Sequence, residues 1–251
     1  VERKLKRRLI KPSDIGCYTL GYQHPLGAVD THFCMGASIG VSCGFSKALD
    51  DPIICTIGDS TFFHAGIPPL VNAVFNKANI NVLVLDNGTT AMTGHQPHPG
   101  VGFTGIGEPT KRIKIEDIAK AIGVGYLRVV DIYDLPQLVK ALEDAVRFDG
   151  VSVVVAKGPC MIIEIREKRR KRVEIVPYFI DEEVCVDCRL CINRFGCPAM
   201  YLMNEKVRIA RSLCAGCGVC GDRLVCPKGA IKRMSEASGA TGKGEGPSGR
   251  K

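Results

Sequence analysis

Apolar runs and amphipathic stretches alternate from Asp14 to about Val155, and this alternation predicts strands separated by helices. Short runs rich in β-branched residues predict buried strands at 53–57, 79–85, 126–130 and 151–156. Apolar positions at helical spacing predict helices near 68–77, 115–122 and 135–148, and Pro68 and Pro69 suit the first turn of the first one. Strands separated by helices of this length imply a parallel sheet that is covered on both faces.

The alternation of predicted strands and helices ends after residue 157. Residues 158–180 contain Gly158-Pro159 and a charged run, and they predict a linker to a small cysteine-rich domain at 181–233. The end of the chain, 234–251, is rich in Gly, Ser and Lys and predicts disorder. The expected organisation is therefore a basic N-terminal segment at 1–13, an α/β domain at 14–157, the linker, the cysteine-rich domain and the tail.

The composition is compatible with one domain of ordinary size plus a small one, since the chain has 251 residues of which 45% are hydrophobic. It contains no stretch of eighteen apolar residues, so we expect no membrane span. The basic start is not followed by an apolar segment, so we expect no secretory signal, and the first residue, Val1, leads us to expect an alternative start or a fragment. Abundant cysteine at metal-ligand spacing favours a cytoplasmic location.

The net charge of +8 is concentrated in basic runs at 3–8 and 166–172. No nucleic-acid-binding motif accompanies these runs, so we do not expect a nucleic-acid partner. A solvated face is the simplest interpretation of such runs. A docking surface for an acidic electron-carrier protein is the alternative, because charge complementarity steers such encounters.

Eight of the 13 cysteines lie in two near-copies of one pattern that ends in Cys-Pro. They are Cys185, Cys188, Cys191 and Cys197 in the first run, and Cys214, Cys217, Cys220 and Cys226 in the second. In two-cluster ferredoxins, three cysteines of one run combine with the fourth of the other. The pattern therefore predicts two [4Fe–4S] clusters in a ferredoxin-like α+β domain that transfers single electrons.

By this rule Cys226 joins the first three cysteines of the first run, and Cys197 joins the first three of the second. Five residues precede Cys-Pro in both runs, at 192–196 and 221–225, where the common bacterial run has three, and this leaves the cluster type open. Zinc is the alternative occupant of cysteine quartets, although zinc ribbons rarely repeat three evenly spaced cysteines before Cys-Pro.

A second motif begins where the strand at 53–57 ends, in Gly58-Asp59-Ser60, and after 26 further residues Asn87 follows the next strand. Ligands bind at the carboxyl ends of parallel strands in such folds. Asp59 offers a carboxylate, Asn87 an amide oxygen, and the backbone near Thr89 a carbonyl, which together suit a Mg²⁺ ion that holds a diphosphate. The alternative is an ordinary βα turn in which Asp59 caps a helix.

Together with the cysteine runs, this motif resembles the 2-oxoacid:ferredoxin oxidoreductases, in particular the large subunits of the indolepyruvate type. The segments that carry the resemblance are 14–21, 34–40, 58–66 and 86–97, of which Thr-Thr-Ala-Met-Thr-Gly at 89–94 is specific. Ser60 stands at the third position of the motif, where the family's thiamine diphosphate motif Gly-Asp-Gly has its second glycine, and Asp86 stands where asparagine is common. The resemblance implies that the cofactor is bound by Cys34, Met35, Gly36, Gly58, Asp59, Ser60, Asn87, Thr89, Ala91 and Met92.

The resemblance further implies oxidative decarboxylation of an aryl 2-oxoacid to an acyl-CoA, with thiamine diphosphate and Mg²⁺ as cofactors and ferredoxin as electron acceptor. The family's pyrimidine-binding domain, with its activating glutamate, has no counterpart before Asp14, so another domain or a second subunit is expected to supply it. A pyruvate or other 2-oxoacid enzyme is one alternative. A non-catalytic electron-transfer subunit is the other.

Three histidines lie within or just after the segments that carry the resemblance. His64 follows the Gly-Asp-Ser motif and is a candidate for contact with the substrate carboxylate or for proton transfer, with a structural hydrogen bond as the alternative. His95 lies in the Gly/Pro-rich loop that we expect to cover the cofactor, and it is the second candidate. His98, in the same loop, is expected to be merely exposed.

Overall fold

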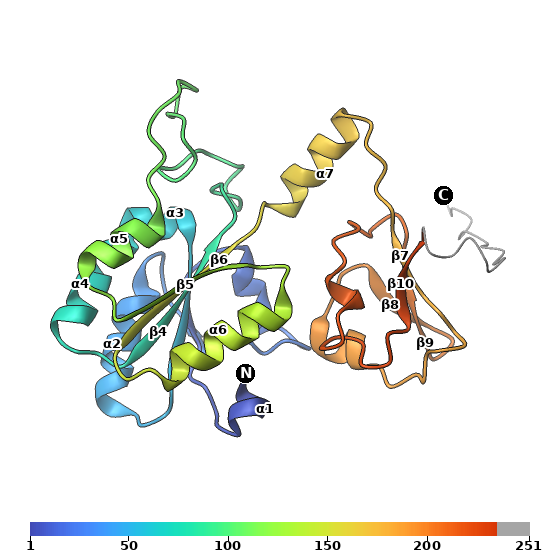
Figure 1. Cartoon of the computed structure of the whole chain (residues 1–251), viewed down its shortest axis with the longest axis horizontal. Helices are drawn as coiled ribbons and strands as arrows, with labels where there is room; N and C mark the ends of the chain where they lie inside the picture. The colour runs from blue at the N-terminus through green and yellow to red at the C-terminus, as the bar shows by residue number, and fades with distance from the viewer. Residues whose placement is uncertain (235–251) are drawn as a thin grey trace. The chain divides into compact units, whose positions relative to one another are not determined.

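The computed structural model describes residues 1–234, and the chain divides into a first compact unit, Val1–Arg166, and a second one that begins at Glu167 (Figure 1). The division falls within helix α7 (Met161–Arg170), which is formed by residues of the expected linker. The tail expected at 234–251 lies, apart from its first residue, outside the described residues.

The first unit is built on a six-stranded sheet, and every neighbouring pair of its strands is parallel. The strand order is β2-β1-β3-β4-β6-β5. The bounds are β1 Pro12–Ser13, β2 Thr31–His32, β3 Ile54–Gly58, β4 Ile80–Asp86, β5 Tyr126–Asp131 and β6 Val151–Lys157. The predicted parallel sheet is confirmed. Two further strands, β1 and β2, are too short to leave a pattern in the sequence.

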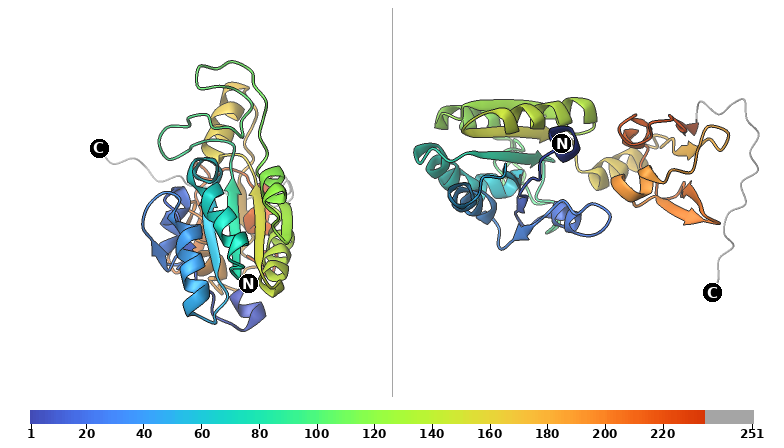
Figure 2. Two further views of the ribbon diagram at one scale, coloured as in Figure 1. Left: turned by 90° about the vertical axis from the view of Figure 1, so that its left-hand side faces the viewer. Right: turned by 90° about the horizontal axis from the view of Figure 1, so that it is seen from below.

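Helices cover both faces of this sheet (Figure 2). One face carries α2 (Ala37–Ala48), α4 (Ile67–Phe75) and α5 (Ile115–Ile122), and the other carries α6 (Leu135–Arg147). Alternate side chains of β6 enter the two cores: Val153 and Val155 pack below the first group of helices, whereas Val154 and Ala156 pack against α6. Because both faces are buried, β6 is apolar almost without interruption.

Local signals in the sequence set the ends of the helices. Asp134 caps α6, because its Oδ1 accepts a hydrogen bond from the Gln137 amide at 3.0 Å. Helix α5 ends at Ile122 and is capped by Gly123, whose φ of 89° is left-handed and suits glycine. Helix α4 ends at Phe75 rather than near Lys77, since Lys77 itself has a φ of 49°. Two shorter elements, α1 (Glu2–Leu5) and the 3₁₀ helix η1 (Cys17–Tyr22), precede the sheet's main strands.

The second unit consists mainly of turns and two short antiparallel pairs. Strand β7 (Tyr178–Ile180) pairs with β10 (Ile231–Arg233), and β8 (Met200–Met203) pairs with β9 (Lys206–Ile209). The π-helical turn η3 (Cys191–Phe195) and the 3₁₀ turn η4 (Val219–Gly221) lie between them in sequence. No helix in the described part of the chain has the length and apolar character needed to cross a membrane.

Candidate functional site

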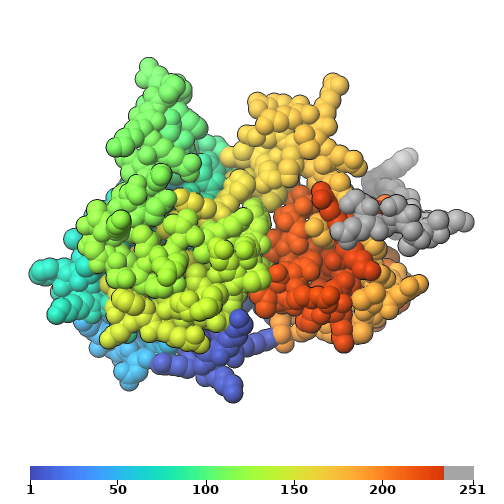
Figure 3. Space-filling model, viewed as in Figure 1, coloured from blue at the N-terminus to red at the C-terminus, as the bar shows by residue number. Residues whose placement is uncertain are grey.

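The residues of the Gly-Asp-Ser motif lie at the carboxyl edge of the parallel sheet. Strands β3 and β4 pair in a register that places Gly58 opposite Leu85, so the chain leaves both strands at the same level. Asp59 begins the short helix α3 (Asp59–Thr61), which continues into the π-helical turn η2 (Phe62–Gly66). The loop that follows β4 stands out beyond this edge of the sheet, as the green segment in Figures 1 and 3 shows.

Asp59 is the hub of the hydrogen bonds at this edge, and it is only 2% exposed. Its Oδ1 accepts the amide of Ser60 at 2.7 Å, and its Oδ2 accepts the amide of Gly88 at 2.8 Å. The Nε2 atom of His98 lies 3.1 Å from the same Oδ2. One carboxylate therefore joins the end of β3 to two points of the loop after β4.

The loop after β4 is also fixed by its own polar side chains. Asn87 Oδ1 accepts the amide of Thr89 at 3.0 Å, which closes a tight turn. The Thr90 hydroxyl donates to the Ser60 hydroxyl oxygen at 2.8 Å. The two halves of the sequence motif, separated by 26 residues, are thus held together by Asp59 and by the Ser60–Thr90 pair.

The oxygen atoms at this edge fit a hard cation. Each carboxylate or amide oxygen has two acceptor positions, and Asp59 Oδ1 and Asn87 Oδ1 each use one of them for a backbone amide. The second position on each oxygen remains for a metal ion, and oxygen ligands are those that Mg²⁺ prefers. Among residues 1–234 no group of three or more His, Cys, Asp and Glu side chains is arranged to hold a metal ion, so a cation here relies on one carboxylate with amide and carbonyl oxygens.

A second carboxyl group, that of Asp86, lies beside Asp59. Its pKa is raised, first by burial and then by the neighbouring charge of Asp59. Lys157 Nζ lies 3.8 Å from Asp86 Oδ2 and opposes this shift, while it binds Glu116 Oε1 at 2.8 Å. The two carboxyl groups, Asp59 and Asp86, therefore lie close enough at this edge for the charge of Asp59 to act on Asp86.

A cavity of about 490 Å³ opens on the other side of the β4 end. It is lined by Asp86, Asn87 and Gly88 and by residues that follow β5 and β6, among them Tyr133, Lys157 and Cys160. Arg112, from the end of the loop, completes its rim. Asn87 thus borders both the Asp59 cluster and this cavity.

The candidate segment 34–36 approaches the motif through Gly36. Cys34 and Met35 are exposed, and Gly36 has a φ of 89° where it precedes α2. A Cβ atom on Gly36 would lie 2.4 Å from the Cβ of Ala65, so only glycine allows this contact with η2.

We expect the change Gly36→Ala to lower the free energy of unfolding by about 2–4 kcal/mol, because a left-handed φ and a steric overlap both act against a methyl group. Urea denaturation measures the effect. The control is Gly40→Ala in α2, where an added Cβ meets nothing within 4 Å and a small gain in stability is expected. Equal losses in both variants would contradict the close contact at Gly36.

The three histidines differ in their exposure and in their contacts with Asp59. His64 is exposed on η2, and His95 is partly exposed with a φ of 68°; no hydrogen bond or ion pair within residues 1–234 joins either of them to Asp59. The expectation that His98 is exposed is wrong, because it is 8% exposed and packs on Asp59. His98 is 39 residues from Asp59 along the chain, and no local pattern in the sequence indicates their contact.

Two further residues near the motif had no predicted role. The Tyr18 hydroxyl accepts the amide of Gly58 at 2.9 Å, and burial, followed by the charge of Asp14, raises the pKa of this tyrosine. Asp14 is fully buried, its Oδ1 accepts the Ser38 amide at 3.2 Å, and burial raises its pKa. Both residues fix the backbone that surrounds the turn at Gly58. The remaining candidates, Ala91 and Met92, lie partly and largely exposed on the loop after β4.

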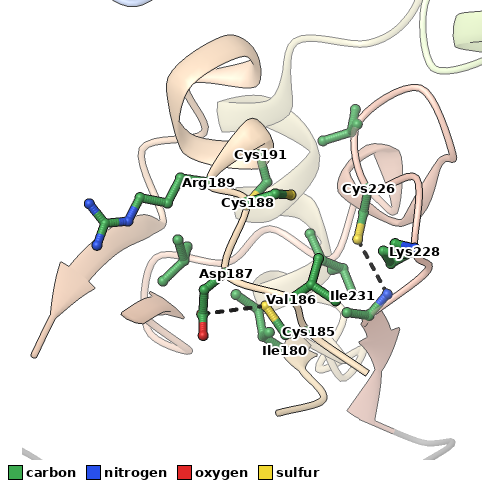
Figure 4. A pocket seen from close by; sticks show the side chains of 13 residues that line it. Ile180, Cys185, Val186, Asp187, Cys188, Arg189, Cys191, Cys226, Lys228 and Ile231 are labelled. Atoms are coloured by element: carbon green, nitrogen blue, oxygen red, sulfur yellow. Dashed lines mark hydrogen bonds between the residues drawn. The ribbon is translucent and has the colours of Figure 1, made fainter. Parts of the chain in front are cut away.

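In the second unit, four cysteines line one cavity (Figure 4). They are Cys185, Cys188, Cys191 and Cys226. Figure 4 shows the Cys226 sulfur held by a backbone amide, which is that of Ala230 at 3.2 Å, and the Cys185 sulfur beside the Asp187 carboxylate at 3.7 Å. Cys226 comes from the second run, so the structure places the fourth cysteine of one run with three of the other.

The other four cysteines, Cys197, Cys214, Cys217 and Cys220, lie near enough to one another for the charge of one to affect the pKa of another. Burial raises the pKa of Cys220 to about 12, with further contributions from its three cysteine neighbours. The Tyr178 amide donates to the Cys214 sulfur at 3.4 Å. All 13 cysteines of the chain are free thiols.

The five-residue segments before Cys197 and Cys226 are accommodated as turns. The first contains most of the π-helical turn η3 and ends at Gly196, whose φ is 64°. In the second, the Asp222 side chain accepts the Leu224 amide at 2.7 Å, and its backbone carbonyl accepts the Cys226 amide at 2.8 Å. The additional residues therefore coil locally, and both Cys-Pro cysteines reach the opposite run.

The comparisons with known proteins agree with this geometry. Residues 14–156 match the family described as thiamine pyrophosphate enzyme, C-terminal TPP binding domain. The chain is 53% identical over 221 residues to indolepyruvate oxidoreductase subunit IorA of Archaeoglobus fulgidus, and 45% identical over 245 residues to that of Pyrococcus horikoshii. These alignments cover 88% and 91% of the chain but only 35% and 37% of the two relatives.

A solved structure of 2-oxoglutarate:ferredoxin oxidoreductase from Magnetococcus marinus superposes with a TM-score of 0.56 at 19% identity. The superposition covers 61% of this chain and 55% of that one, and it shows that the two share a fold. The resemblance to the indolepyruvate-type subunits that was inferred from the sequence is confirmed by the two archaeal relatives. The chain therefore belongs to the thiamine pyrophosphate enzymes and carries their C-terminal TPP-binding domain.

Proposed function

We propose that this chain is the part of a 2-oxoacid oxidoreductase that binds the diphosphate of thiamine diphosphate and carries electrons away from it, with aryl 2-oxoacids of the indolepyruvate type as substrates. The observation that supports this most directly is the presence in one chain of the Asp59–Asn87 edge and of two cysteine quartets. An oxidative decarboxylation that ends in one-electron transfer needs both.

In this proposal, Asp59, Asn87 and the Thr89 carbonyl hold Mg²⁺, and the ion holds the diphosphate. The Ser60–Thr90 hydrogen bond keeps the two ligand-bearing segments in register. When bound, thiamine diphosphate supplies the carbanion chemistry of the decarboxylation, and the protein orients it. His64 and His95 remain candidates for contact with the substrate carboxylate or for proton transfer, and both lie on the segments that flank this edge.

The cysteine quartets would hold [4Fe–4S] clusters in a ferredoxin-like domain. Amide-to-sulfur hydrogen bonds at Cys226 and Cys214 suit such clusters, whose potentials respond to these bonds. Electrons then pass to ferredoxin, and coenzyme A receives the acyl group.

The proposal requires further protein, because the chain spans little more than a third of the length of its two archaeal relatives. Large apolar side chains are exposed on η1 and on the segment between η1 and α2, namely Leu20 at 66%, Phe33 at 68% and Met35 at 48%. We propose that a pyrimidine-binding domain, together with a second subunit, covers this surface and completes the cofactor site.

The test is the binding of thiamine diphosphate, measured by calorimetry with Mg²⁺ and with a chelator. The chain is measured alone and together with the part of the Archaeoglobus fulgidus subunit that it does not cover. We expect Mg²⁺-dependent binding that strengthens when this part is added. If thiamine diphosphate binds neither to the chain alone nor to the chain with the added part, the proposal is overturned and a non-catalytic electron-transfer subunit is favoured.

A further inference from the structure

The His98 side chain lies in a loop, but three different segments of the chain make close contacts with it. Its Nε2 lies 3.1 Å from Asp59 Oδ2, and its Nδ1 accepts the amide of Gly100 at 3.1 Å. Its ring stacks on Phe63 of η2, with centroids 5.6 Å apart and planes inclined by 30°. The histidine is thus fixed by the motif, by its own loop and by the helix that follows Asp59.

These contacts define which ring nitrogen carries the hydrogen. Because Nδ1 accepts the Gly100 amide, Nδ1 has no hydrogen and the ring hydrogen lies on Nε2. Nε2 therefore donates a hydrogen bond to Asp59 Oδ2, and Nδ1 cannot replace it as the donor because Nδ1 carries no hydrogen.

The two carboxylate oxygens of Asp59 differ in the hydrogen bonds that they accept. Oδ2 receives two donors, the Gly88 amide and His98 Nε2, and its acceptor positions are filled. Among the hydrogen bonds within residues 1–234, Oδ1 receives only the amide of Ser60, which leaves one acceptor position on this oxygen. The carboxylate cannot rotate without breaking the bonds to Oδ2, so Oδ1 is the oxygen presented to a ligand.

We propose that His98 is a positioning residue that fixes the Asp59 carboxylate so that Oδ1 faces the cation and Oδ2 is anchored to the loop. This inference rests on the proposed function, since it takes Asp59 to be a Mg²⁺ ligand. Partners that orient a metal-ligating carboxylate commonly contribute 10–100-fold to metal affinity.

The packing around the ring supports a specific requirement at Gly100. A Cβ atom there would lie 2.8 Å from Phe63 Cε2 and 2.9 Å from His98 Cε1. No such contact arises at Gly105 of the same loop, where an added Cβ meets nothing within 4 Å. The change Gly100→Ala therefore displaces the imidazole ring although residue 98 is still histidine. Gly105→Ala is its matched control.

The first readout needs no cofactor and uses the free chain. The hydrogen-bond acceptor of the Gly88 amide is Asp59 Oδ2 and not His98, so the hydrogen exchange of this amide reports the orientation of Asp59. We expect His98→Ala and Gly100→Ala to accelerate this exchange at least about tenfold. His98→Gln keeps an N–H donor and is expected to restore slow exchange, and Gly105→Ala should match the wild type. Unchanged Gly88 exchange in a folded His98→Ala or Gly100→Ala protein would overturn the proposal.

The second readout is the affinity for Mn²⁺, a spectroscopic substitute for Mg²⁺, measured by electron paramagnetic resonance with thiamine diphosphate present. We expect His98→Ala to weaken Mn²⁺ binding by about 10–100-fold and His98→Gln to recover most of it. If the wild-type chain binds no Mn²⁺ even with the uncovered part of the Archaeoglobus fulgidus subunit added, the proposed function is contradicted, whereas normal binding by a folded His98→Ala protein contradicts only the role of His98. If His98→Gln binds Mn²⁺ as weakly as His98→Ala does, the hydrogen bond from residue 98 to Asp59 does not explain the role of His98.

Discussion

The change Asp59→Asn is expected to lower the Mg²⁺-dependent affinity for thiamine diphosphate by roughly 2–3 orders of magnitude. Asparagine has the shape of aspartate, but it removes the charge of a side chain that is 2% exposed. It also replaces one acceptor oxygen by an NH₂ group, which accepts no hydrogen bond, so either the Ser60 amide or the pair formed by the Gly88 amide and His98 Nε2 loses its acceptor. The same calorimetric titration that tests the proposed function measures the loss.

The matched control is Asp149→Asn, at the opposite edge of the sheet. Asp149 is exposed and accepts a hydrogen bond from the Asn79 side chain at 3.2 Å, just before β6 begins. Its replacement should leave the affinity within about twofold of wild type, since an exposed polar contact of this kind contributes little. If Asp59→Asn binds the Mg²⁺ complex as tightly as the control does, Asp59 is not a ligand.

Pairs of cysteine replacements are expected to show which cysteines share a cluster. Double replacement of Cys185 and Cys226 by serine, within one quartet, should reduce the iron content from about eight to about four atoms per chain, since only one four-iron cluster loses ligands. Double replacement of Cys185 and Cys197, which belong to the same sequence run, should remove nearly all iron, because the structure places them in different quartets.

The measurement is iron and sulfide content after anaerobic reconstitution, with the spectrum of the reduced protein as a check. Cys17→Ser is the control, since Cys17 is exposed in the first unit and belongs to neither run. The opposite ranking of the two double variants would show that each cluster uses one run. Zinc in place of iron would refute the cluster assignment as a whole.

Much of the first unit follows from the sequence because burial leaves a readable pattern there. Strands β3, β4 and β6 are covered on both faces, so their side chains are apolar in long runs, and the helices between them carry one apolar face. Strands β1 and β2 have two residues each, and no period can be recognised over so short a length. Their presence depends on the pairing of Ser13 with Thr56 of β3.

The candidate site divides in the same way. Asp59 and Asn87 could be paired from the sequence, because both follow strands that end at one edge of a parallel sheet. Tyr18 and His98 could not be placed, since Tyr18 reaches Gly58 from a short 3₁₀ helix 40 residues away and His98 reaches Asp59 from an irregular loop 39 residues away. Irregular segments carry no period, and their contacts are set by the elements on which they pack.

The sequence by itself determined that this protein has a doubly covered parallel sheet, an oxygen-rich edge at Asp59 and Asn87, and two cysteine runs of one pattern. These features depend on residue type and spacing along the chain. The tertiary structure alone decided that His98 is buried against Asp59 rather than exposed, and that Oδ1 is the carboxylate oxygen left open. The reason is physical: the direction of a carboxylate is set by donors that converge on it in space, and here these come from Ser60, Gly88 and His98.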